Sequence, residues 1–282
     1  MKFENVAVPL VPRSTANCID LALCFMRQHL KPIAGLWATI AVPACLLVYV
    51  LVDQFEFDLS LAIVVFIFAS SPLGILLMTG AAPCAFGERF SYRGTLRRLG
   101  WTDLWLMIKG LLLRVAILVA SMIFIFPGWY LGVKYGFMVE QSVLSKMARH
   151  LHDRRADELL QGEISDLVFR SAAIAVFCLM SWWVLLLTAD FMGSTLLGWP
   201  LLMGRYKGDF SYFTDLGELF GHIFRFLGTD PVVITAELAV AFLVYPIARL
   251  AWFFCYIDVR VRRDCWDMEL KFLQEAQRLE TT

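Results

Sequence analysis

Long apolar runs without charge dominate the pattern along this chain. Three of them have the length of a membrane-crossing helix, at residues 33–52, 59–82 and 172–189. An α-helix needs about 20 apolar residues to cross a hydrocarbon core about 30 Å thick. Two more runs, 111–127 and 232–256, are also long enough, and the first should end where Pro127-Gly128 breaks the helix. Because a helix satisfies its own backbone hydrogen bonds in lipid, the pattern predicts an all-α, polytopic membrane helical bundle.

The run at 128–144 is the weakest candidate, since it is short and contains Lys134 and Glu140. Lys and Arg collect on the cytoplasmic side of membrane proteins. One basic cluster precedes residue 111 and another follows residue 144: Arg89, Arg93, Arg97, Arg98 and Lys109, then Lys146, Arg149, Arg154, Arg155 and Arg170. Both clusters are cytoplasmic only if an even number of crossings separates them. We therefore expect 128–144 to cross back, or to dip in and return, giving about six transmembrane helices with both termini in the cytoplasm.

We expect a single integral membrane domain over residues 1–282. In this prediction 1–32 is a cytoplasmic amphipathic helix, 33–256 the six-crossing bundle, and 257–282 a cytoplasmic C-terminal helix. An outer segment at 190–230 has the periodicity of an apolar helix face, which suits a helix resting on the membrane, a lid or a docking surface. Three basic amphipathic stretches are typical of interfacial helices: 14–30, 90–101 and 146–162.

Composition and charge agree with a membrane location. The chain is 59% hydrophobic and 18% charged, with zero net charge, whereas a soluble domain carries about 25% charged residues. In the predicted topology 20 of the 25 Lys and Arg are cytoplasmic. We expect the bacterial inner membrane as location, with membrane lipids and another membrane or cytoplasmic protein as partners. A neutral chain has no overall field that would attract nucleic acid.

Signals for catalysis are poor. The seven cysteines show no Cys-x-x-Cys pair and no zinc spacing. The four histidines have no convincing metal-ligand spacing, and no phosphate-binding loop, nucleophile elbow or dinucleotide turn is present. We therefore predict no catalytic residue, no metal site and no cofactor.

Charged residues inside the apolar runs are the candidate functional residues, because a charge in the bilayer centre is costly. Arg114, Glu237 and Arg249 lie near the ends of their runs, where structural anchoring is the simpler interpretation. Lys134 and Glu140 fall on different helix faces, so each needs a partner from another helix. Pairing of Glu140 with Arg114 or Arg249 would form either a lock within the bundle or part of a polar path.

Further basic residues are candidates for contact with lipid headgroups or a partner. They lie just past the last run or in the second amphipathic stretch: Arg260, Arg262, Arg263, Arg93 and Arg97. Ordinary anchoring on the cytoplasmic side explains them equally well.

Several short segments follow one another in an order that is also found in other membrane proteins. They are Phe126-Pro127-Gly128-Trp129-Tyr130, Val133-Lys134, Arg154-Arg155, Leu160-Gln161-Gly162, Tyr256-Ile257-Asp258-Val259-Arg260-Val261-Arg262 and Asp267-Met268-Glu269-Leu270. This order resembles bacterial multi-pass proteins similar to the membrane domain of glycerophosphodiester phosphodiesterases. The resemblance covers the chain from Pro127 onward and implies a six-helix domain in a bacterial inner membrane. Because no soluble hydrolase domain is attached in this sequence, we expect no phosphodiesterase chemistry.

Two functions of different classes follow from these patterns. The first is a non-enzymatic membrane scaffold or partner subunit, favoured by the lack of catalytic motifs and by the basic amphipathic stretches. The second is a transporter, channel or lipid-handling protein that uses a polar path through Arg114, Lys134, Glu140 and Arg249. A hydrated cavity at the level of Lys134 and Glu140 would favour the second function, and closed polar contacts the first.

Overall fold

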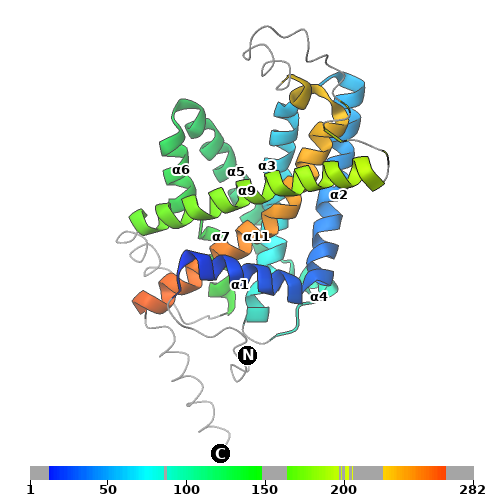
Figure 1. The fold of residues 1–282 in the computed structure, drawn as a ribbon. Coiled ribbons are helices and arrows are strands. Elements are labelled where there is room, and N and C mark those ends of the chain that lie inside the picture. Colours follow the sequence, from blue (N-terminus) through cyan, green and yellow to red (C-terminus); the bar gives the residue numbers. More distant parts are fainter. Residues whose placement is uncertain are drawn as a thin grey trace, which may run out of the picture. The chain divides into compact units, whose positions relative to one another are not determined.

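A computed structural model describes residues 13–85, 88–147, 164–196, 198, 201–202, 205 and 225–264. The helices are α1 (Thr15–Gln28), α2 (Leu30–Phe55), α3 (Leu59–Ala85), α4 (Tyr92–Arg98), α5 (Trp101–Ile123), α6 (Ile125–Lys134), α7 (Met138–Met147), α9 (Ile164–Leu196) and α11 (Pro231–Asp264) (Figure 1). Regular structure in these described ranges is helical, so the all-α class is confirmed.

Five of the helices are long and apolar enough to cross a membrane. They are Leu30–Phe55, Leu59–Ala85, Trp101–Met122, Ile164–Leu196 and Pro231–Arg262. Four of them each contain one strong apolar run of the sequence, and Trp101–Met122 contains most of the fifth run, 111–127. The coarse prediction of a multi-pass helical membrane protein is therefore confirmed.

The weak run at 128–144 does not form one helix. α5 ends at Ile123, with Phe124 as its C-cap, and α6 folds back beside α5 as the second arm of a hairpin (Figure 1). After ten residues α6 also ends, and a turn at 135–137 leads into α7. The expected break at Pro127-Gly128 therefore lies a few residues too late: Pro127 sits in the first turn of α6, where its missing N–H removes no helical hydrogen bond.

Gly128 permits the close approach of α6 to α5. A Cβ at this position would lie 1.9 Å from Ser121 Oγ and 2.9 Å from the backbone oxygen of Ile117. Because a backbone atom is among these neighbours, a larger residue would push the arms of the hairpin apart.

The predicted N-terminal amphipathic helix is α1. Its cap is Ser14, whose hydroxyl accepts a hydrogen bond from the backbone N–H of Asn17 at 3.3 Å. Phe25 of α1 packs edge-on against Phe254 of α11, with ring centroids 6.0 Å apart. The second stretch forms only the short helix α4, and most of the third, 146–162, lies outside the described residues.

At the other end, α11 continues without interruption past residue 256 to Asp264. The expected boundary at 256–257 is therefore not a helix end. Residues 265–282, and most of the outer segment at 190–230, lie outside the described part of the chain.

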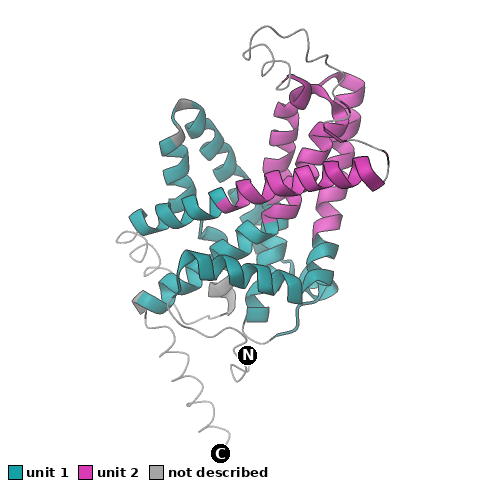
Figure 2. Cartoon of the chain, viewed as in Figure 1, with its two compact units in different colours: residues 1–36, 71–176, 246–282 teal, residues 37–70, 177–245 magenta. Residues whose placement is uncertain are grey.

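The chain divides into two compact units, and the boundary falls inside α2, α3, α9 and α11 (Figure 2). Unit 1 comprises residues 1–36, 71–176 and 246–282, and unit 2 comprises residues 37–70 and 177–245. The core of unit 2 includes a cluster of Leu186, Leu202 and Val233, with Trp182 and Phe226 against it. The fully buried aromatic residues Phe137, Phe253 and Phe254 belong to unit 1.

Candidate functional site

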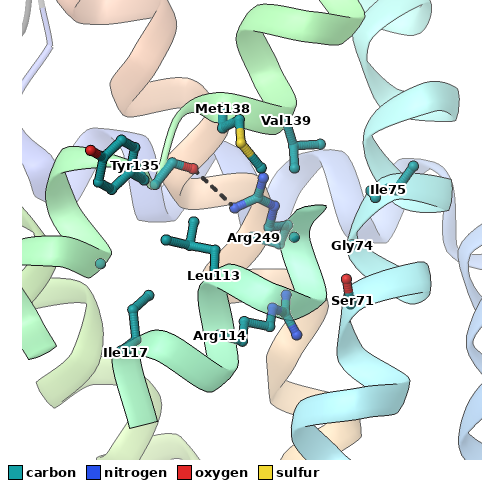
Figure 3. A pocket seen from close by; sticks show the side chains of 13 residues that line it. Ser71, Gly74, Ile75, Leu113, Arg114, Ile117, Tyr135, Met138, Val139 and Arg249 are labelled. Atoms are coloured by element: carbon teal, nitrogen blue, oxygen red, sulfur yellow. Dashed lines mark hydrogen bonds between the residues drawn. The ribbon is translucent and has the colours of Figure 1, made fainter. Parts of the chain in front are cut away.

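A cavity of about 170 Å³ lies within unit 1. Residues from α3, α5, α6, α7, α11 and the turn after α6 line it. Figure 3 shows the arginines of this wall, Arg114 from α5 and Arg249 from α11, together with Ser71 of α3. The other lining residues are apolar, glycine or Tyr135.

Arg249 is held in place by Glu140, which lies in the first turn of α7. Nη2 of Arg249 lies 2.8 Å from Oε1 and 2.9 Å from Oε2 of the carboxylate. Nη1 donates a longer hydrogen bond, 3.5 Å, to the backbone oxygen of Gly136 (Figure 3). The Glu140 side chain has no exposed surface and that of Arg249 is 13% exposed. A buried charge is tolerated only when it is paired, so each residue requires the other.

The turn at 135–137 places Glu140 opposite Arg249. Phe137 is stacked on Trp252 of α11, with ring centroids 4.6 Å apart and an interplanar angle of 19°. Gly136 has no room for a side chain, because a Cβ would lie 2.6 Å from the backbone oxygen of Gly132 and 2.9 Å from Trp252 Nε1. The stacked ring and the glycine together fix the start of α7 against α11, one turn of α11 away from Arg249.

The structure brings together part of the group of intramembrane charges that the sequence singled out. Glu140 pairs with Arg249, as one of the two expected partners, and Arg114 lines the same cavity as Arg249. Lys134 is exposed, does not line the cavity and places its Nζ 5.4 Å from the ring centroid of Tyr135. Glu237 belongs to unit 2, where it is buried and its backbone oxygen accepts a hydrogen bond from the Trp182 indole.

A second buried charge cluster in unit 1 is centred on Asp258 of α11. Its Oδ2 lies 2.6 Å from Nη1 of Arg170, and its side chain is fully buried. Its Oδ1 accepts a hydrogen bond of 2.5 Å from the backbone N–H of Arg13. Arg262, one turn along α11, places Nε 3.1 Å from Oδ2 and donates from Nη2 to the backbone oxygen of Arg13 at 2.7 Å. We call this group the Asp258 cluster.

Sequence reasoning missed the role of this cluster. From the sequence, Arg262 is a candidate for contact with lipid headgroups or a partner, and Arg170 is one member of a cytoplasmic basic cluster. The four-residue spacing of Asp166 and Arg170 does indicate an ion pair along one helix, and on α9 Arg170 Nε lies 2.6 Å from Asp166 Oδ2. What the spacing did not reveal is that Asp258 faces inward, where it contacts two other segments of the chain.

The basic residues expected to contact lipid headgroups or a partner lie in different environments. Arg93 and Arg97 are exposed on α4, whereas Arg262 belongs to the Asp258 cluster. Arg260 is partly buried, and the side chain of Arg263 lies outside the described residues. Within the described ranges, no group of three or more His, Cys, Asp or Glu residues is placed to hold a metal ion.

The chain matches no protein-family model, no curated protein and no solved structure. The resemblance to the membrane domain of glycerophosphodiester phosphodiesterases therefore stays a prediction. Its terminal Tyr-x-Asp-x-Arg-x-Arg pattern does acquire a physical role here, since the aspartate and the last arginine are Asp258 and Arg262 of the Asp258 cluster.

We predict that Asp258→Asn destabilises the protein by about 3–5 kcal/mol, because it leaves the buried Arg170 guanidinium without its main counter-charge. The measurement is the free energy of unfolding in detergent micelles. Asp166→Asn is the matched control: its carboxylate is 50% exposed, so its loss should cost at most about 1 kcal/mol. The double variant Asp258→Asn with Arg170→Gln should be less destabilised than the sum of the single changes. Strict additivity would contradict the pairing.

Glu140→Gln should likewise cost about 3–5 kcal/mol, since it leaves Arg249 as an uncompensated buried charge. The exposed Lys134 provides the control, and Lys134→Gln should change stability by less than about 0.5 kcal/mol. Both variants are compared with the wild-type chain in the same unfolding assay. Equal stability of the two variants would refute the role of Glu140 as a lock.

Proposed function

We propose that this chain is a non-enzymatic scaffold or partner subunit of a bacterial inner-membrane complex, in contact with membrane lipids. It crosses the membrane six times, with both termini in the cytoplasm. The observation that carries the proposal is the closed Glu140–Arg249 pair, in which the carboxylate is fully buried. A polar path needs hydrated charges along it, whereas these two charges satisfy each other inside the packed helices.

The Asp258 cluster supports the six-crossing topology. Its hydrogen bonds join the backbone at Arg13, the first turns of α9 and the end of α11. Segments bonded to one carboxylate lie on the same side of the membrane, so an even number of crossings must separate each pair of them. Between Arg13 and α9 lie the long helices α2, α3 and α5. One more crossing is needed there, and α9 and α11 then bring the total to six.

α6 and α7 supply the missing crossing in this proposal. Each has ten residues, which corresponds to about 15 Å of helix. Together they match a hydrocarbon core about 30 Å thick. A crossing made of two half-helices leaves backbone groups unpaired at the break, and such a break is tolerated where it is buried in protein or lines a cavity. The turn at 135–137 meets this condition, since Tyr135 and Gly136 line the cavity.

α9 presents the surface that a scaffold would offer to a partner. Only 11% of the most apolar 18-residue stretch of α9 is buried within the described part of the chain. Large apolar side chains on its unit 2 part recur at steps of three and four residues and are exposed: Met180, Val184, Leu187 and Phe191. Leu186, on another face of α9, is fully buried. An apolar stripe of this kind contacts lipid chains or a transmembrane helix of another protein.

A second function, lipid or anion handling, is favoured by one observation. The cavity in unit 1 is lined by two arginines, Arg114 and Arg249. Arginines that reach a cavity within a membrane-embedded region are commonly part of a binding site or pathway.

The topology is tested with single cysteines introduced into a variant that lacks the seven native ones. We expect Phe55→Cys and Phe124→Cys, both at exposed helix ends, to react with a membrane-impermeant maleimide added to intact spheroplasts. Ser165→Cys, exposed at the start of α9, and Arg97→Cys should react only after lysis. Labelling of Ser165→Cys from outside would mean that α6 and α7 do not return the chain, and the six-crossing topology would be wrong.

The scaffold function is tested by photo-cross-linking in native membranes, followed by gentle purification and mass spectrometry. A photoreactive residue at Val184 should cross-link one defined protein that co-purifies in a fixed ratio with this chain. The same residue at the buried Leu186 position is the matched control and should not yield that product. If Val184 yields lipid adducts alone and the chain purifies without a protein partner, the scaffold function is wrong and lipid or anion handling is favoured.

A further inference from the structure

An exposed basic corner lies where α4 leads into α5. Residues 88–109 contain five Lys and Arg but only two Asp and Glu. Both acids have partners within the corner: Glu88 Oε2 lies 2.6 Å from Nη2 of Arg98, and Asp103 accepts a hydrogen bond of 3.0 Å from the Gly100 backbone N–H. The other three arginines are exposed and have no ion pair among the described residues: Arg89, Arg93 and Arg97. The described part of the chain therefore leaves this positive charge uncompensated.

The packing of α4 on α3 fixes the direction in which the arginines point. Thr95 of α4 is buried. A Cβ at Gly80 of α3 would overlap the ring of Phe90 and lie 2.8 Å from Thr95 Oγ1, so this face of α4 rests closely on α3. Arg93 and Arg97 are each two positions from Thr95, which is about 200° around a helix. Both guanidinium groups therefore project from the face opposite α3, side by side on successive turns.

The start of α5 has the aromatic residues of a membrane surface. Trp101, its first residue, is 82% exposed, and Trp105 is exposed one turn later. α5 is one of the helices long and apolar enough to cross a membrane. Tryptophan collects at the level of the lipid headgroups, where its ring is apolar and its N–H is hydrated. Lys109 lies another turn along, and its Nζ approaches the ring of Trp105 to 5.8 Å from the centroid, as expected when a lysine extends back toward the membrane surface.

Charge decides which lipids this corner attracts. Arginine donates two parallel hydrogen bonds to phosphate oxygens through its planar fork. A zwitterionic headgroup has a positive group of its own, so a surplus of arginines favours lipids with net negative charge. Near an anionic membrane surface each Lys or Arg strengthens binding by roughly fivefold. Because α4 precedes Trp101 directly, Arg93 and Arg97 lie close to the headgroup level that the tryptophans mark.

We infer that the α4–α5 corner is a binding surface for anionic phospholipids, held by Arg93, Arg97 and the tryptophans at positions 101 and 105. The inference rests on the lipid contact in the proposed function and deepens it, because it names the lipid class and the place where that class binds. In the proposed topology the surface lies on the cytoplasmic side of the membrane.

The test uses the full-length chain without its native cysteines, reconstituted in phosphatidylcholine. A nitrobenzoxadiazole fluorophore is attached at Leu104→Cys, an exposed position between the two tryptophans. Quenching by nitroxide-labelled phosphatidylglycerol and by nitroxide-labelled phosphatidylcholine is compared at equal mole fractions. We expect phosphatidylglycerol to bind about fivefold more strongly near position 104. This preference should fall toward one when ionic strength rises from about 0.01 M to about 1 M, since the Debye length shortens from about 30 Å to about 3 Å. Val119→Cys, exposed near the other end of α5, is the matched control and should report no preference.

Variants on α4 show whether the arginines are responsible. Arg93→Gln combined with Arg97→Gln should abolish the preference at position 104, because both free charges are removed. Arg93→Lys combined with Arg97→Lys should retain most of it, because the charges remain. Both positions are exposed, so neither pair of changes should disturb the fold.

Equal quenching by the two lipids in the wild-type background, or a preference that survives the glutamine changes, would overturn the inference. Either result would leave the scaffold function intact, since that function depends on the protein partner captured at Val184. Absence of that partner would in turn leave the lipid preference at position 104 unchanged, so the two failures are distinguishable.

Discussion

A carboxylate removed from water must be fully paired, and this requirement at Asp258 organises unit 1. The side chain is buried in α11, so it takes its partners from wherever the chain can supply them: Arg170 on α9, Arg262 one turn ahead and the backbone at Arg13. Three segments more than 80 positions apart in sequence are thereby joined at one carboxylate. In the proposed topology, the even number of crossings between these segments, and with it the return of the chain through α6 and α7, rests on this single interaction.

The second buried pair has two consequences at once. Glu140 neutralises one edge of the Arg249 guanidinium and closes the contact between α7 and α11. The same bond fixes Arg249 in the wall of the cavity that Arg114 also lines. Both depend on the turn at 135–137, where Gly136 and the stacked Phe137 leave little freedom of position.

Local features of the fold could be predicted from the sequence with fair accuracy. The five strong apolar runs correspond to the five long helices, and Ser14 caps α1 as its side-chain chemistry suggests. The weak run could not be resolved in the same way. Its length and its two charges are compatible with one crossing helix, yet Gly136 and the packing of Phe137 on Trp252 divide it in two. That contact joins residues 115 positions apart, which no local pattern contains.

The sequence by itself determined the helical class, the multi-pass character and the residues whose charges need partners, because hydropathy and charge are properties of each position and its near neighbours. Tertiary structure alone decided which partners those charges have. Glu140 is bonded to Arg249, one of the two arginines considered for it, and Lys134 is exposed. Asp258, which the sequence shows only as part of the terminal Tyr-x-Asp-x-Arg-x-Arg segment, is the centre of a buried cluster. The reason is physical: pairing of a buried charge depends on how helices meet in space, and that geometry is fixed by packing over the whole unit.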